Sequence, residues 1–108
     1  MSFNILRTDV FSKHLKQLAK KYPSIKNDFS SFLISLESDP LQGISLGKNC
    51  YKVRLKINSK NTGKSGGGRI ITYVRIEQKR IILLDVYDKA DRTTISDKEL
   101  SILLKHID

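Results

Sequence analysis

The chain has 108 residues and one cysteine, and its 20 lysines and arginines outnumber its 11 aspartates and glutamates to give a formal net charge of +9. This length predicts one domain, over residues 1–108, that folds without staples, while one cysteine and two histidines exclude an internal disulfide and argue against a metal or other cofactor. No apolar run approaches the roughly 18 residues of a membrane span, so we expect a cytoplasmic protein without a membrane partner. The positive net charge favours a polyanionic binding partner.

The first forty residues predict a short strand followed by two helices that cover a sheet. Residues 2–7 fit the strand, and Thr8 or Asp9 can cap an amphipathic helix. Pro23 suits the first turn of a second helix, because its missing amide proton costs nothing there. The segment "SDP" at 38–40 ends that helix, since the residue before a proline avoids helical geometry.

The rest of the chain predicts three strands and a last helix. Residues 50–57, 69–77 and 80–88 are rich in β-branched and aromatic side chains, and the two-residue joint between the last two indicates an antiparallel meander. Ser96 and Glu99 have the spacing of a capping box at the start of the final helix. The order β-α-α-β-β-β-α therefore predicts an α+β fold, with two N-terminal helices packed on one face of a small antiparallel sheet.

The middle of the chain carries an unusual excess of basic residues. Between Asp39 and Glu77 there is no acidic residue. The same segment contains Lys48, Lys52, Arg54, Lys56, Lys60, Lys64, Arg69 and Arg75. A solvated strand face normally mixes charge signs, because like charges side by side repel each other. We therefore expect an anion from outside the chain to neutralise these side chains.

Strand alternation predicts which side chains share a face of the sheet. If Val53 and Leu55 point toward the helices, Lys52 and Arg54 point away from them. On the two later strands the alternation predicts inward-pointing Ile70, Val74, Ile76, Ile82, Leu84 and Val86, with Ile81, Leu83, Asp85 and Tyr87 opposite.

The uncovered face of the sheet is then expected to gather cations and aromatic rings, namely Lys52, Arg54, Arg69, Tyr73 and Tyr87. Single-stranded nucleic acid favours this combination, because cations bind phosphates and rings stack on bases. Other conspicuous residues have plainer interpretations. We expect His14 to be an ordinary polar or packing residue of its helix, Cys50 a small buried side chain, and Asp85 an ion-pair partner of arginines.

Three segments, "NCYKVRLK", "GGGRIITY" and "IILLDVYDKADR", follow one another in an order and spacing that resemble the RelE/HigB family of toxins from bacterial type II toxin–antitoxin systems. The resemblance covers nearly the whole chain in element order, and its specific part spans Gly47 to Arg92. It implies a RelE-like fold and a metal-independent endoribonuclease that cuts mRNA in the ribosomal A site and so inhibits translation. It also implies a cognate antitoxin of the HigA or RelB kind, and this antitoxin can be a helix-turn-helix protein. Operator DNA is then expected to bind the toxin–antitoxin complex and not the toxin alone.

The resemblance also implies roles for single residues. The candidate catalytic residues are Lys52, Arg54, Arg69, Tyr87, Lys89 and Arg92, and the candidate RNA-binding residues are Lys48, Lys56, Lys64, Tyr73 and Arg75. Relatives place a tyrosine a few residues beyond the basic cluster, or histidines around the end of the last strand. This chain has Ile95, Ser96 and Asp97 beyond the cluster and no histidine near that strand in sequence, so Tyr87 is the expected substitute.

Cleavage of RNA by its own 2′-hydroxyl requires a proton acceptor, in-line geometry and neutralisation of the phosphate, and cations can supply the last without a metal. Lys52 is the candidate general base, because the neighbouring like charge of Arg54 favours a neutral amine. Arg69 can fork onto the phosphate oxygens, and Tyr87 or Lys89 can give a proton to the leaving 5′-oxygen.

Two other functions compete with the nuclease. One is a ParE-like toxin that inhibits DNA gyrase without cutting nucleic acid, and the other is a non-catalytic module that binds nucleic acid. The basic residues Lys52, Arg54 and Arg69 favour the nuclease, because an inhibitor that binds protein does not need a face ready for phosphate.

Overall fold

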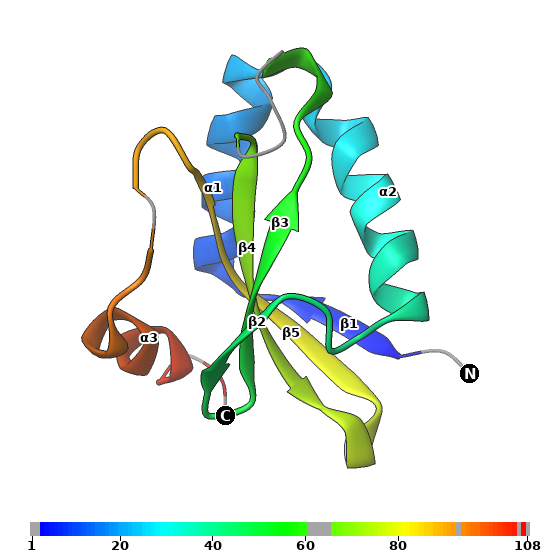
Figure 1. Ribbon diagram of the computed structural model, residues 1–108, viewed down its shortest axis with the longest axis vertical. Coiled ribbons are helices and arrows are strands. Elements are labelled where there is room, and N and C mark those ends of the chain that lie inside the picture. The colour runs from blue at the N-terminus through cyan, green and yellow to red at the C-terminus, as the bar shows by residue number, and fades with distance from the viewer. Residues whose placement is uncertain (1–2, 61–65, 93, 106, 108) are drawn as a thin grey trace.

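The computed structural model describes residues 3–60, 66–92, 94–105 and 107, and it has the predicted α+β architecture (Figure 1). In chain order the elements are β1 (Asn4–Arg7), α1 (Asp9–Lys21), α2 (Ile25–Ser38), β2 (Ile44–Gly47), β3 (Cys50–Leu55), the 3-10 turn η1 (Asn58–Lys60), β4 (Gly68–Arg75), the 3-10 turn η2 (Ile76–Gln78), β5 (Arg80–Asp88) and α3 (Asp97–Leu104). Over the described residues, no helix combines the length and the apolar character needed to cross a membrane.

The helix ends follow local sequence signals. The side chain of Thr8 caps α1 by accepting the N–H of Phe11 at 3.0 Å, and Ser96 and Glu99 form the predicted capping box of α3. The prediction that Pro23 lies in the first turn of the second helix was wrong, because Pro23 precedes α2. The connection between α1 and α2 is therefore a little longer than the sequence indicates.

The sheet has five strands in the order β1-β5-β4-β3-β2. The antiparallel meander of β3, β4 and β5 is confirmed. Residues Ile44–Gly47, for which no strand is predicted from the sequence, form β2, which pairs antiparallel with β3. At the opposite edge β1 lies parallel to β5, so the sheet is mixed. Ile76, expected to point inward, is 44% exposed, because β4 ends at Arg75 and Ile76 belongs to the turn η2.

The main core lies between the sheet and the two N-terminal helices. Phe11 and Leu18 of α1 and Phe32 and Leu36 of α2 contribute to it. They pack with the sheet residues Val53, Leu55, Ile70, Val74, Ile81, Leu83 and Val86. Burial of one such side chain stabilises the fold by roughly 1.5–3 kcal/mol, so this layer supplies most of the driving force for the arrangement.

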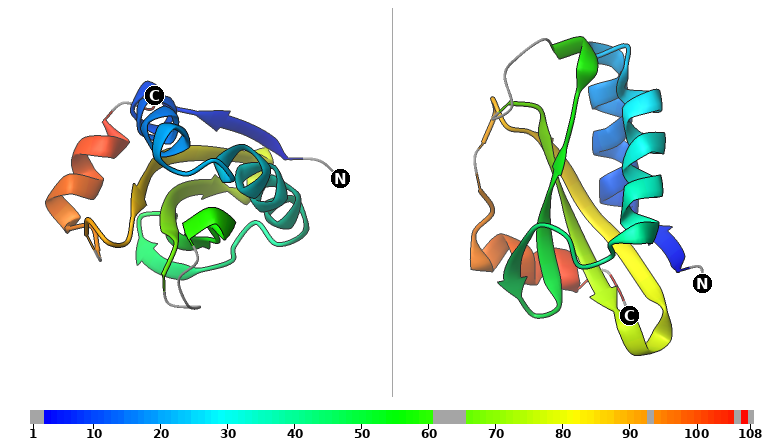
Figure 2. Two further views of the ribbon diagram at one scale, coloured as in Figure 1. Left: turned by 90° about the horizontal axis from the view of Figure 1, so that it is seen from above. Right: turned by 45° about the vertical axis from the view of Figure 1, so that its right-hand side comes forward.

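The opposite face of the sheet is only partly open, because α3 packs on it (Figure 2, right). Ile95 and Leu100 cover a second buried cluster that includes Ile71 and Cys50. Nearly all of β5 is consequently buried on both faces. The uncovered face expected from the sequence is thus confined to the part of the sheet that α3 leaves free.

A β-bulge changes the alternation along β5. Ile71 pairs with Asp85, but the next residue, Thr72, pairs with Leu83, so that Leu84 is an extra residue on β5. Ile81 and Leu83 therefore lie in the helix-side core together with Val86, while Ile82, Leu84 and Tyr87 lie in the cluster on the opposite face. The prediction for residues 81–84 was wrong, because simple alternation does not account for an inserted residue. Tyr87 lies on the predicted face.

Candidate active site

A row of cross-strand neighbours crosses the sheet on the face turned away from α1 and α2. Arg54 of β3 pairs with Arg69 of β4, and Arg69 pairs with Tyr87 of β5. Neighbouring strands lie about 4.8 Å apart, so the three residues stand side by side. Lys52 occupies the next row on the same face, where it pairs with Ile71. These four polar residues, which are candidates for catalysis, are called the catalytic row below.

The cations of the catalytic row have no acidic partner among the residues that the structure describes, since the ion pairs there involve other side chains. The guanidinium of Arg69 donates instead to two backbone carbonyls, those of Gly66 at 3.2 Å and Gly68 at 2.8 Å. Backbone contacts orient this side chain without cancelling its charge. Lys52, Arg54 and Arg69 are therefore three positive charges that no described carboxylate neutralises.

Tyr87 supplies a buried phenol at the end of this row. Its side chain is 7% exposed, and its hydroxyl is buried without a hydrogen-bond partner in the described part of the chain. Burial raises the pKa of Tyr87 above its ordinary value of 10.0, although Arg92 and Arg69 act in the opposite direction. The hydroxyl is therefore protonated at neutral pH.

Arg92 covers Tyr87 but is not a free cation. Its guanidinium carbon lies 4.4 Å from the centre of the Tyr87 ring, a cation–π contact. The same guanidinium donates to Asp85 at 2.9 Å and to Glu99 at 2.7 Å. The expected role of Asp85 as an ion-pair partner is confirmed. Arg92, a candidate catalytic residue by the resemblance, is thus held by two carboxylates.

His14 reaches this region from α1. Its Nδ1 lies 2.5 Å from Oδ1 of Asp85, which also accepts the N–H of Val86 at 2.8 Å. The expectation that His14 is an ordinary polar or packing residue of its helix did not include this contact with Asp85. A signal was present, because His14 lies between Phe11 and Leu18 at helical spacing and so belongs to the buried stripe of α1.

Asp88 fixes the end of β5, next to the catalytic row. It is 1% exposed and accepts hydrogen bonds from Lys60, from the hydroxyl of Tyr22 at 2.6 Å and from the N–H of Ala90 at 2.9 Å. Burial alone would raise the pKa of Asp88, but these hydrogen bonds outweigh it and lower the pKa to about 2. Lys60 also donates to the carbonyl of Gly67 at 3.3 Å, so this cation serves the fold and not an open face.

Lys89 lies close to the catalytic row, whereas several other predicted site residues lie elsewhere. The N–H of Lys89 donates to the carbonyl of Gly67 at 3.0 Å, beside the start of β4. Lys48 is in the β2–β3 turn and contacts Ser101 of α3 at 2.9 Å. Lys56 follows β3 and lines a groove beside α2, which Arg54 of the catalytic row also borders. Lys64 falls outside the described residues.

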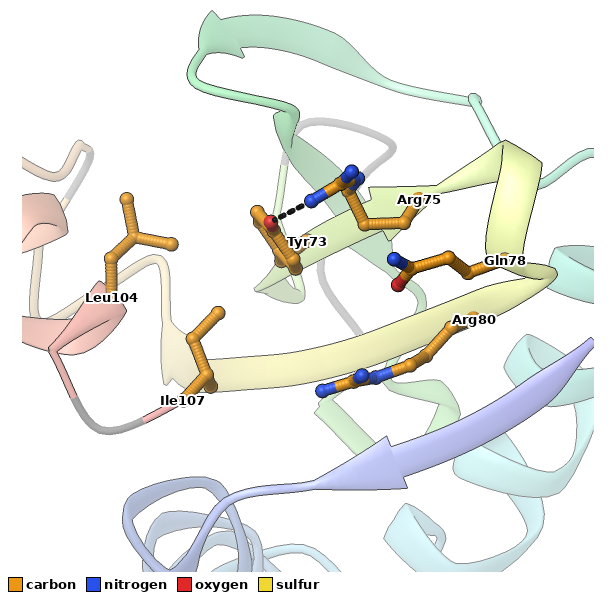
Figure 3. Close-up of a pocket in the computed structure, with 6 residues that line it drawn as sticks. All are labelled: Tyr73, Arg75, Gln78, Arg80, Leu104 and Ile107. Carbon is orange, nitrogen blue, oxygen red and sulfur yellow. Dashed lines mark hydrogen bonds between the residues drawn. The ribbon is translucent and has the colours of Figure 1, made fainter.

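Tyr73 and Arg75 lie on the predicted face of β4 but at its far end (Figure 3). Arg69 and Arg75 are six residues apart on one strand, which corresponds to about 20 Å. Arg75 donates to the hydroxyl of Tyr73 at 3.1 Å and pairs with Glu77 at 2.5 Å. These residues therefore belong to a separate pocket and not to the catalytic row.

The described residues contain no group of three or more histidine, cysteine, aspartate or glutamate side chains arranged to hold a metal ion. Cys50 is buried, as expected, and burial raises its pKa to about 11. The functional groups of the catalytic row are an amine, two guanidinium groups and a protonated phenol.

Comparisons with known proteins place the fold. No protein-family model matches the chain, and no curated protein matches its sequence. A structure of the E. coli toxin RelE in the free state, with two arginines replaced by alanine, has a TM-score of 0.61 and 17% identity and covers 99% of both chains. The isolated E. coli RelE toxin has a TM-score of 0.61 and 14% identity, covering 96% of this chain and 98% of that one.

The intact E. coli RelBE toxin–antitoxin complex matches with a TM-score of 0.61 and 17% identity, over 81% of this chain and 96% of that chain. The likeness extends along nearly the full length of both proteins, and at such low identity it shows a shared fold.

Proposed function

Because the chain has the RelE-like fold, we propose that it is the toxin of a type II toxin–antitoxin system and cleaves mRNA in the ribosomal A site of the cytoplasm. The observation that carries this proposal is the direct pairing of Arg54 with Arg69 across two strands. Like charges in such positions destabilise a sheet, and no described carboxylate offsets them. A bound phosphate would offset both.

The chemical step uses the ribose of the substrate as nucleophile. Lys52 accepts the proton of the 2′-hydroxyl, the 2′-oxygen bonds to phosphorus, and the bond from phosphorus to the 5′-oxygen breaks. Arg54 and Arg69 neutralise the charge that develops on the nonbridging oxygens. Tyr87 gives its proton to the leaving 5′-oxygen. The products are a 2′,3′-cyclic phosphate and a 5′-hydroxyl.

Tyr87 is the preferred proton donor for three reasons. It stands in register with Arg69, its hydroxyl has no competing partner among the described residues, and its raised pKa keeps it protonated. Lys89 is the alternative donor, since it follows β5 directly. Arg92 is proposed as a positioning residue, because its contacts to Asp85 and Glu99 hold it over the ring of Tyr87.

An antitoxin of the RelB or HigA kind is the proposed protein partner. The similar E. coli protein is seen with its antitoxin in the RelBE complex. An acidic segment lying over Lys52, Arg54 and Arg69 would neutralise the same charges as a phosphate. Operator DNA is then a partner of the toxin–antitoxin complex and not of this chain alone.

Primer extension on mRNA after induced expression tests the function. The wild-type chain should produce new cuts within codons, and Arg69→Ala should lower the cleavage rate at least about 100-fold because a transition-state donor is lost. Lys26→Ala is the matched control, since this exposed residue of α2 also removes one positive charge. Gyrase-linked DNA breaks without mRNA cuts would overturn the nuclease, as would unchanged cleavage in Arg69→Ala that has kept its fold.

A further inference from the structure

A second polar pocket lies at the far end of β4 from the catalytic row (Figure 3). Its volume is about 400 Å³, which is the size range of small-molecule sites. It is lined by Tyr73, Arg75, Gln78, Arg80, Leu104 and Ile107. Figure 3 shows contributions from β4, from the turn after it, from β5 and from the end of α3. This distal pocket is not part of the chemistry proposed above.

The distal pocket contains a second pair of like charges in direct register. Arg75 and Arg80 are cross-strand neighbours on β4 and β5, an arrangement that destabilises a sheet unless the charges are offset. Arg75 is offset by Glu77, at 2.5 Å. Arg80 takes part in none of the ion pairs found among the described residues.

Arg80 also has an unused hydrogen-bond donor. Its Nε is buried and has no partner in the described part of the chain. A buried donor left unpaired is costly, and the cost is greater when the group is charged. In Figure 3 the side chain of Arg80 extends along β5 toward Ile107, so its guanidinium borders the pocket. An anion in the pocket would offset the charge of this guanidinium.

The remaining walls suit the organic part of a nucleotide. Tyr73 provides a ring, Leu104 and Ile107 provide apolar surface, and the amide of Gln78 offers both a donor and an acceptor to a base edge. We propose that the distal pocket binds a nucleotide of the RNA substrate away from the cleaved bond, with a phosphate on Arg80 and the base against Tyr73 and Gln78. The identity of the ligand as RNA rests on the proposed function.

The placement of the pocket favours RNA over an acidic peptide. Arg69 and Arg75 alternate onto the same face of β4, with the cluster that α3 covers around Ile71 between them, so a polymer that passes along α3 can meet both ends of the strand. The separation of about 20 Å exceeds the reach of a single nucleotide but not that of a short oligonucleotide. A peptide carboxylate would use the arginines, but it would have no need of a base-sized wall with an amide.

The direct test measures binding of 2′-O-methyl oligonucleotides, which lack the nucleophile and are not cleaved. With an oligonucleotide of about ten nucleotides, Arg80→Gln should weaken binding about tenfold, and the slope of log affinity against log salt should fall by about 0.7 because one phosphate contact is lost. A dinucleotide is too short to span both sites, so its inhibition of cleavage at the catalytic row should be equal in wild type and variant. Lys26→Gln, which removes an exposed charge on α2, should match wild type with both probes.

A second variant keeps the test independent of folding. Arg75→Gln changes a partly exposed side chain at the same pocket and should show the same dependence on oligonucleotide length. Equal binding of the long oligonucleotide by wild type and both folded variants would overturn the proposal that the distal pocket binds RNA. The proposed cleavage of mRNA would be unaffected by that result. If the variants lose affinity only for the long oligonucleotide, but the wild type cleaves no mRNA, the proposed RNA site is retained and the proposed nuclease activity is overturned. Unchanged RNA binding with weaker binding of a glutamate-rich peptide overturns the nucleotide assignment.

Discussion

His14 and Asp85 are 71 residues apart in sequence, yet their side chains meet with 2.5 Å between Nδ1 and Oδ1. Through this carboxyl group, a helix on one side of β5 is connected to Arg92 and hence to the ring of Tyr87. The proton donor proposed for cleavage is thus supported by a chain of contacts that begins in α1.

Replacement of His14 tests this support. We expect His14→Leu to lower the free energy of unfolding by about 1 kcal/mol, because the buried carboxyl of Asp85 loses a hydrogen-bond donor. Urea denaturation measures the change, with Lys16→Leu, an exposed substitution on the same helix, as control.

The same variant separates positioning from packing. If His14 acts through Arg92, His14→Leu lowers kcat for RNA cleavage with little change in KM, and His14→Gln, whose amide can still donate to Asp85, restores part of the loss. Equal unfolding energies and equal kcat values for His14→Leu and Lys16→Leu would show that the contact contributes nothing.

Removal of the Tyr87 hydroxyl separates catalysis from stability. We expect Tyr87→Phe to lower kcat about 100-fold or more, because general acid catalysis is lost, and to leave thermal stability unchanged or raised, because the hydroxyl makes no hydrogen bond with the described residues. Since the pKa of Tyr87 lies above 10.0, the wild-type activity that depends on the protonated hydroxyl should persist as the pH rises to that value. Full activity of a folded Tyr87→Phe variant would transfer the acid role to Lys89.

The buried carboxyl of Asp88 predicts a loss of stability in acid. Its pKa is lowered from 3.8 to about 2, so the carboxylate form is favoured in the folded protein. This contribution, about 2 kcal/mol, is present above pH 3.8 and is lost as the pH falls through about 2. Unfolding free energies measured across this window should decline in the wild type and decline less in Asp88→Asn.

Asp91→Asn serves as the comparison for Asp88, because it removes an exposed carboxyl of the turn after β5. It should keep the wild-type pH dependence. An identical acid profile in Asp88→Asn and Asp91→Asn would assign the stabilisation to other groups.

Local signals in the sequence predicted the helices and the central meander well. Thr8 and the pair of Ser96 and Glu99 act on neighbouring backbone groups, so their effect does not depend on the rest of the fold. The strand β2 was missed, because four residues beside a glycine give little periodicity. Its formation depends on pairing with β3, which is a tertiary effect.

The candidate site was predicted in part for a similar reason. The alternation of side chains gave the correct face for Arg54, Arg69, Tyr73 and Tyr87, but it gave no position along the strands, so Tyr73 was grouped with a row that lies several residues away. The contact of His14 with Asp85 depends on how α1 docks on β5 and on the inserted residue in that strand, and neither can be read from spacing.

The inserted residue Leu84 lets a single strand serve two separate tasks. Before Leu84, the side chains of Ile81 and Leu83 point into the core beneath the helices. After it the alternation shifts by one residue, so that Val86 points into that core and Tyr87 points to the opposite face. If β5 kept Leu84 but paired with β4 without the bulge, every later side chain of the strand would point to the opposite face. The phenol would then enter the helix layer, and a nonpolar residue would replace it beside Arg69.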